Sequence, residues 1–246
     1  MASKNQTALV KNENLPTFLQ QNNTRRGTED VGAEDLVIPR LELVQALSPC
    51  RKRNDAAYIE GAEEGMLFNS LTRELYGQSV ELIPVKYRKE YLIWKDRKKG
   101  GGFRGSFPTE LEAEQARRQL EDGEDCEVLD TGIMFCLRVA EGGRLEEIVV
   151  SMSKSRMKTA RKWNSLIRLT QHDSFAKRYE ISAVAEKNAN NEDYWNIAVK
   201  PLGFVDENQY RSAEELYRVI EGGGVVADRS QGDDPAPTGR GGPSEF

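Results

Sequence analysis

The sequence predicts a mixed β fold with inserted helices, an antiparallel OB-like barrel between disordered N- and C-terminal ends. Stretches of alternating apolar residues recur through the middle of the chain, whereas helical periodicity occurs in three places only. Strands and helices do not alternate regularly, which argues against a parallel doubly wound sheet. Among antiparallel barrels, the OB-fold is the one that binds oligonucleotides.

Composition divides the chain of 246 residues into three parts. Residues 1–34 are polar and lack periodicity, so we expect a disordered N-terminal arm. Residues 35–221 are expected to form a single OB-like nucleic-acid-binding domain, because this length can bury a proper core. Residues 222–246 are acidic and rich in Gly and Pro, and predict a disordered tail.

The first half of the domain reads mainly as strands. Order is expected from residue 36, with a short strand at 66–69 and a turn at 72–77. The longest strand is predicted at 80–95, where side chains two residues apart share a face. Its core face is expected to carry Ile83, Val85, Tyr87, Tyr91 and Ile93. Its opposite face is expected to carry Lys86, Arg88, Leu92 and Trp94.

The second half mixes helices and hairpins. Thr109 and Glu112 fit a capping box, which predicts a helix from there to about residue 120. Ser212 and Glu215 fit a second box, which predicts a helix ending at residue 221. Between these helices we expect, in order, an acidic loop at 121–130, a hairpin of strands at 132–140 and 144–152, a helix at 153–170, and strands at 178–186 and 194–205.

A basic stretch with interleaved aromatic rings, residues 86–104, is the first candidate nucleic-acid site. Cations neutralise phosphates, and flat rings stack on unpaired bases for about 1–3 kcal/mol each. A flexible Gly-rich loop at 100–102 could follow a phosphate backbone. The alternative is a solvated strand, which we prefer for Tyr87 and Tyr91. The candidate DNA-binding residues here are Lys86, Arg88, Trp94, Lys95, Arg97, Lys98, Lys99, Phe103 and Arg104.

The helix predicted at 153–170 is the second candidate site. Its apolar residues Ala160, Trp163, Leu166 and Ile167 cluster on one side, and no acidic residue interrupts positions 151–168. A cationic stripe on the other side loses stability by self-repulsion unless an anion offsets it. The alternative is an ordinary solvated helix surface. The candidate DNA-binding residues are Lys154, Lys158, Arg161 and Arg168.

The tail is a candidate partner-binding segment. A terminal aromatic residue on an acidic tether suits a small pocket with a basic rim, and the expected contacts are Asp233, Asp234, Glu245 and Phe246. The tail could also fold back over the DNA groove as a competitor. Most charged termini are merely solvated, which is the alternative.

Composition argues against several classes of protein. The net charge of −5 argues against a uniformly basic, duplex-coating protein, although local patches still attract DNA. We expect no enzyme, metal site or cofactor, since the single His172 lacks a partner histidine and no phosphate-loop motif occurs. The three cysteines have no CxxC spacing, which indicates reduced thiols. No signal peptide or membrane span is evident, so a cytoplasmic protein is expected.

Several short segments together point to a known family: residues 37–41 (VIPRL), 46–49 (ALSP), 68–69 (FN), 76–77 (YG) and 84–87 (PVKY), then Trp94 and residues 194–197 (YWNI). They resemble a group of bacteriophage replication and recombination proteins, the phage single-stranded DNA-binding proteins. The tail resembles those of bacterial and phage single-stranded DNA-binding proteins, which are acidic and end in phenylalanine. It departs from their pattern at Arg229, Arg240 and residues 243–244.

This resemblance implies sequence-tolerant binding that protects single-stranded DNA during phage replication and recombination, in the cytoplasm of a bacterial host. It also implies a tail that recruits replication or recombination proteins, and a homo-oligomer is a further possibility. Two alternatives stay open at this point. One is a phage structural or interaction protein, acting in assembly or in inhibition of host defence. The other, which fewer features favour, is a metal-dependent nuclease.

Overall fold

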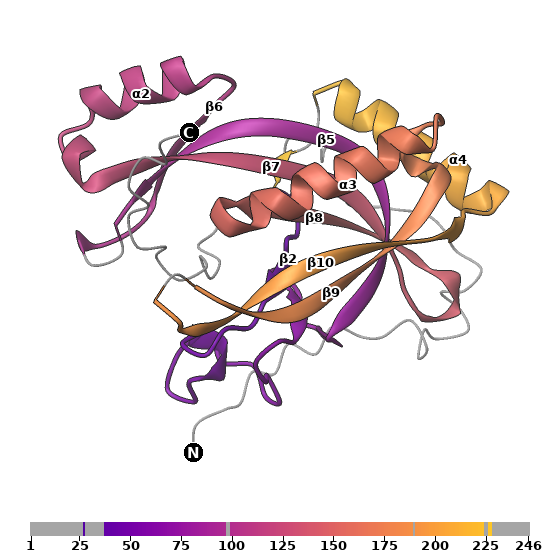
Figure 1. Cartoon of the computed structure of the whole chain (residues 1–246), viewed down its shortest axis with the longest axis horizontal. Coiled ribbons are helices and arrows are strands. Elements are labelled where there is room, and N and C mark those ends of the chain that lie inside the picture. The colour runs from indigo at the N-terminus through magenta and orange to yellow at the C-terminus, as the bar shows by residue number, and fades with distance from the viewer. Residues whose placement is uncertain (1–26, 28–36, 97–98, 189, 224–225, 228–246) are drawn as a thin grey trace.

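The computed structural model describes residues 27, 37–96, 99–188, 190–223 and 226–227, which centre on a six-stranded antiparallel sheet (Figure 1). Its strand order is β10-β9-β5-β7-β8, and β6 pairs with one end of β5. These strands are β5 (Ser79–Lys95), β6 (Phe103–Phe107), β7 (Cys126–Val139), β8 (Leu145–Ser153), β9 (Lys177–Lys187) and β10 (Asp193–Phe204). The predicted hairpin and the strands expected at 80–95, 178–186 and 194–205 are confirmed.

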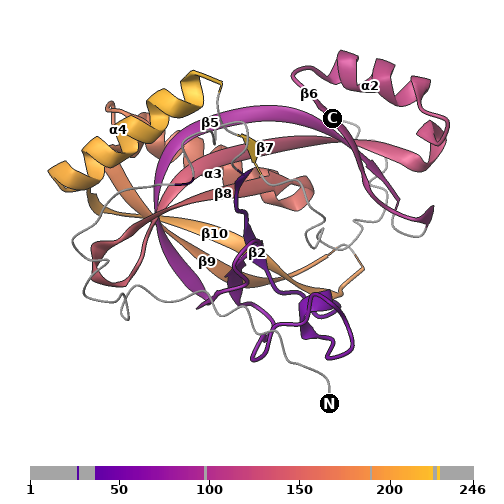
Figure 2. The ribbon, with the colours of Figure 1, turned by 180° about the vertical axis from the view of Figure 1, so that it is seen from behind.

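Two helices cover opposite faces of this sheet (Figures 1 and 2). On one face lies α3 (Met157–Leu169). Its fully buried Trp163 packs against Tyr179, with the two ring centres 5.9 Å apart. On the other face lies α4 (Glu207–Glu221), whose buried Leu216 and Ile220 belong to a second core with Phe135. The main sheet therefore has a core on each side.

The sheet does not close into a barrel, so the predicted OB-like barrel is wrong, while the antiparallel β fold with inserted helices is confirmed. Its two edge strands find other partners. The amide side chain of Gln45 donates to the backbone oxygen of Trp195 on β10 (2.8 Å) and accepts from its N–H (2.9 Å). At the other edge, the N–H of Val149 on β8 donates to the oxygen of Pro39 (2.8 Å).

A β-bulge divides β5 into two parts. The register against β7 shifts between Pro84 and Lys86. Before the bulge, Ile83 and Val85 pack in the core beneath α4, and after it Tyr87 packs beneath α3. A bulge adds one residue to one strand and reverses which face the following side chains occupy. The single core face predicted for residues 83–93 is therefore wrong.

A projecting arm extends from one end of the sheet (Figure 1). It consists of the far ends of β5 and β7, strand β6 and helix α2 (Glu110–Gln119), around a small core with Ile93, Ala113 and Cys126. The side chain of Thr109 accepts from the N–H of Glu112 (3.3 Å), which confirms Thr109 as the predicted N-cap. The expected acidic loop at 121–130 is shorter, because a 3-10 turn (Gly123–Asp125) leads directly into β7.

Helix α4 begins earlier than expected. Asp206 and Gln209 form its capping box, in which the N–H of Gln209 donates to Asp206 (2.8 Å) and the N–H of Asp206 donates to Gln209 (3.2 Å). The box predicted at Ser212 and Glu215 lies inside the helix and is wrong. Helix α3 begins later than expected, because Lys154–Arg156 form a 3-10 turn first.

The N-terminal part of the described chain forms smaller sheets. Strands β2 (Leu41–Leu43), β3 (Leu67–Asn69) and β4 (Leu75–Gly77) make one, so part of the turn expected at 72–77 is a strand. A two-residue strand β1 (Val37–Ile38) pairs in parallel with β11 (Val226–Ala227), which falls within the predicted tail. The expected N-terminal arm, apart from residue 27, and the tail from residue 228 lie outside the described residues.

No helix in the described part of the chain combines the length and apolar character needed to span a bilayer.

Candidate nucleic-acid interface

Lys86 and Arg88, two of the predicted DNA contacts, hold the end of α4. The Arg88 guanidinium donates to the backbone oxygen of Ile220 (2.6 Å) and lies 5.3 Å from the ring centre of Phe135. Lys86 forms an ion pair with Glu221. Desolvation, with a smaller contribution from Arg88, lowers the pKa of Lys86. Cations next to the last carbonyl groups of a helix stabilise it, so both residues have a structural role.

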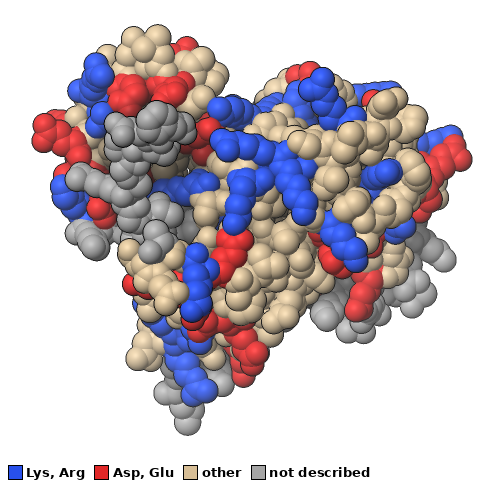
Figure 3. Space-filling view, viewed as in Figure 1, with Lys and Arg blue, Asp and Glu red and all other residues tan. Residues whose placement is uncertain are grey.

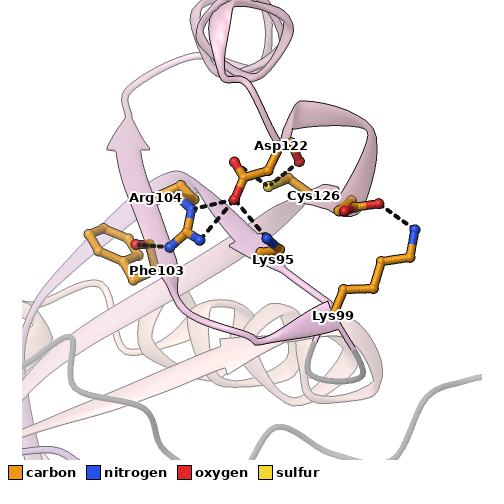
Figure 4. A network of polar contacts seen from close by, with 7 residues as sticks. Lys95, Lys99, Phe103, Arg104, Asp122 and Cys126 are labelled. Atoms are coloured by element: carbon orange, nitrogen blue, oxygen red, sulfur yellow. Dashed lines mark hydrogen bonds and ion pairs between the residues drawn. The ribbon is translucent and has the colours of Figure 1, made fainter.

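The cations beside the Gly-rich loop contact acidic residues of the loop between α2 and β7 (Figure 4). Asp122 pairs with Lys95 (3.0 Å) and accepts from Arg104 Nη2 (2.9 Å) and Nε (3.2 Å). Hydrogen bonds, first from Arg104 and then from Lys95, lower the pKa of Asp122 to about 2. Lys99 pairs with Asp125. The described cations of this loop are thus neutralised within the chain, and Arg97 and Lys98 lie outside the described residues.

The predicted stacking rings, Trp94 and Phe103, contact each other. Their ring centres lie 5.5 Å apart at an interplanar angle of 58°, and both side chains are half-buried. Tyr91 and Ile93 pack beneath α2, so the alternation of the strand directs Trp94 to the opposite face. Because Tyr87 lies on the same face as Tyr91 and packs beneath α3, these rings lie on the other side of the sheet from α3.

The N-terminal side of α3 is held by two ion pairs. Lys154 contacts Glu127 of the arm (2.6 Å), and Lys158 contacts Glu186 of β9 (2.7 Å). Glu186 also accepts from Tyr194 (2.7 Å) and Asn196 (2.8 Å). Burial alone would raise the pKa of Glu186, but these hydrogen bonds together hold it below its ordinary value. Lys154 and Lys158 are therefore engaged, although 60% of the Lys158 side chain is exposed.

The rest of the outer face of α3 differs. Arg161, Lys162 and Arg168 are exposed and have no ion-pair partner among the described residues. Lys and Arg side chains gather across the middle of this face of the molecule, where α3 lies (Figure 3). Lys162 was not among the predicted contacts, although it follows Lys158 by four residues, the spacing that places side chains on one helical face. We call Arg161, Lys162 and Arg168 the α3 cation face.

Tyr87 supports this helix from below. Its ring packs against the core that contains Trp163 of α3, and desolvation, with a smaller contribution from Asp130, raises its pKa. Its ring lies across Gly132 of β7, where a Cβ atom would be 2.6 Å from the tyrosine oxygen. Only glycine leaves room for this ring, so the position of α3 depends on a close contact between the two strands beneath it.

Among the described residues, no group of three or more His, Cys, Asp or Glu side chains is placed to hold a metal ion. Cys50, Cys126 and Cys136 are buried free thiols.

The family model described as Pam3 phage gp34-like protein matches residues 5–226, most of the chain. The chain belongs to this family. Its membership supports the phage origin that the sequence resemblance implied. Searches of curated proteins and of solved structures gave no match.

Proposed function

We propose that the protein binds single-stranded DNA through the α3 cation face, with little sequence preference, during phage replication or recombination. The strongest support is that Arg161, Lys162 and Arg168 are exposed and form no ion pair with the described residues. Like charges on one helical face repel each other. A phosphate backbone would relieve this repulsion.

Such contacts would be made to the nucleic-acid backbone. Arg161 and Arg168 are seven residues apart, about 10 Å along a helix axis. Contacts to phosphate position a protein on its ligand but do not read sequence, which fits tolerance for many sequences. The same proposal assigns Asp233, Asp234, Glu245 and Phe246 of the tail to the recruitment of replication or recombination proteins.

A second candidate function is an interaction protein whose α3 cation face meets an acidic protein surface. The position of Trp94 and Phe103 favours it, because these rings lie on the other side of the sheet from α3. Base stacking contributes much of the affinity for unpaired strands. A cationic face separated from Trp94 and Phe103 fits carboxylates as well as phosphates.

Fluorescence anisotropy with labelled single-stranded and duplex oligonucleotides of equal length, over a salt series, tests the proposal. We expect tighter binding to the single strand and a steep loss of affinity with salt. A matched control replaces Lys52, Arg53 and Arg118 with Ala, which removes three exposed cations that lie away from α3, and should bind like wild type.

Two results would contradict the proposal. Equal affinity for duplex and single strand would show a general polyanion site, and no binding at low salt would favour the interaction protein. The same oligonucleotides incubated with Mg²⁺ and run on a denaturing gel test the nuclease alternative, since shortened products would reveal cleavage.

A further inference from the structure

We infer that the α3 cation face also docks helix α2 of a second copy of this chain, in a head-to-tail contact between an acidic and a cationic helix end. This inference goes beyond DNA binding, and the interface it describes would form without nucleic acid.

The cationic partner of this contact is the C-terminal half of α3. Leu169, its last residue, is 77% exposed. Arg168 precedes it, and Lys162 lies seven residues before it on the same helical face. Both cations are exposed and have no ion-pair partner among the described residues. An exposed leucine flanked by unpaired cations is thus one half of the surface.

The acidic partner is the first turn of α2. Leu111 is 69% exposed and lies directly between Glu110 and Glu112, which are both exposed. Neither glutamate has an ion-pair partner in the described part of the chain, whereas the third acidic residue of this helix, Glu114, pairs with Arg117 (2.9 Å). This turn therefore presents an exposed leucine beside two unpaired acids, a charge opposite to that at the end of α3.

The two surfaces belong to separate parts of one molecule, so the proposed contact forms between copies. Helix α2 packs on the core of the arm, and α3 packs on the core of the main sheet (Figure 1). Figure 3 shows acidic and basic side chains together over the arm, and mainly cationic ones across the middle, where α3 lies. Complementary charges bring such surfaces together and set their register. Because the two patches differ, the contact is heterologous and extends into short chains or a ring.

Charge reversal with analytical ultracentrifugation tests the inference. At low salt the wild-type protein should sediment above the 27.7 kDa of a single chain, and at high salt it should return to the monomer. Glu110→Lys with Glu112→Lys should abolish association, and so should Lys162→Glu with Arg168→Glu. The four substitutions combined in one chain should restore it. Lys52→Glu with Arg53→Glu is the matched control for charge and should associate like wild type.

Each other result would overturn the inference. A wild-type protein that stays monomeric at low salt has no such contact. Association that survives both pairs of reversals uses another surface, and failure of the fourfold variant to associate while circular dichroism shows it folded would remove the pairing of α2 with α3. The DNA titrations have an independent readout, so loss of DNA binding leaves these outcomes unchanged.

Discussion

The α3 cation face and the Gly-rich loop of the arm both come from segments rich in Lys and Arg. They differ in whether acidic residues of the chain contact these cations. Residues 86–104 contain eight Lys or Arg and two acidic residues, and residues 151–170 contain six and none. In the structure, Lys95, Lys99 and Arg104 of the arm contact acids, whereas three cations of α3 remain exposed and without ion pairs in the described chain. Cation density along a sequence therefore does not identify a cation available to a ligand.

Acidic residues from elsewhere in the chain cause the difference. The turn after α2 places Asp122 and Asp125 against the loop, 18 to 27 residues after the cations they contact. Along α3, the neighbouring acids Glu127 and Glu186 reach only Lys154 and Lys158. Availability is thus decided by which acids the fold brings to each region.

The largest effect should follow from removing the support of α3. Trp163→Ala deletes a fully buried indole between α3 and the sheet, and substitutions of this kind cost about 3–5 kcal/mol. Urea unfolding followed by circular dichroism should show this loss. Leu169→Ala on the exposed end of the same helix should change the free energy of unfolding by less than about 0.5 kcal/mol. Similar stability for both variants would contradict the packing described for α3.

Two matched triple variants should separate the regions by function. Replacing Arg161, Lys162 and Arg168 with Ala should weaken single-stranded DNA binding and lower the salt slope by about 2, since each phosphate contact adds about 0.7. Replacing Lys95, Lys99 and Arg104 with Ala should leave that slope unchanged, because acids already neutralise these cations. Anisotropy titrations measure both. An equal loss of slope in the two variants would show that DNA displaces Asp122 and Asp125.

Acid should destabilise the arm through Asp122. Its pKa is lowered from 3.8 to about 2, so its interactions stabilise the fold above about pH 4 and are lost as the pH falls towards 2. Thermal melts between pH 2 and pH 6 should show this loss. Asp122→Asn cannot titrate, and its melting temperature should fall less steeply over the same range. Parallel pH profiles of the two proteins would argue against the charge network of Asp122.

Local signals predicted much of the fold. The cap of α2 at Thr109, the hairpin of β7 and β8, and the apolar side of α3 follow from spacing alone, and the structure confirms them. The start of α4 did not follow, because Asp206 with Gln209 and Ser212 with Glu215 both fit a cap and only tertiary packing selects the first. The bulge at Pro84 had a sequence signal that was not used, since proline inside a central strand is found at bulges.

Contacts between residues far apart in the sequence could not be predicted from local patterns. At the edge of the sheet, the backbone N–H and oxygen of Trp195 are paired by the side chain of Gln45, a residue 150 positions away. Only part of the candidate site could be predicted, because long-range contacts decide the rest. The positions of Arg161 and Arg168 on α3 followed from helical spacing, but the acids that occupy Lys95 and Arg104 come from another element.

The smallest effect should come from removing the acidic partner of one paired cation, which frees that cation for DNA. Glu127 binds Lys154 at 2.6 Å, next to the first turn of α3, and 53% of the glutamate side chain is exposed. Glu127→Gln removes this charge, so Lys154 could contact a phosphate and the affinity for single-stranded DNA at low salt should rise a few fold. The salt slope should become steeper by about 0.7, one additional contact. Glu192→Gln, which removes one charge from an exposed loop, is the matched control. If both variants gain affinity equally, net charge alone explains the change, and the difference between engaged and available cations has no consequence for binding.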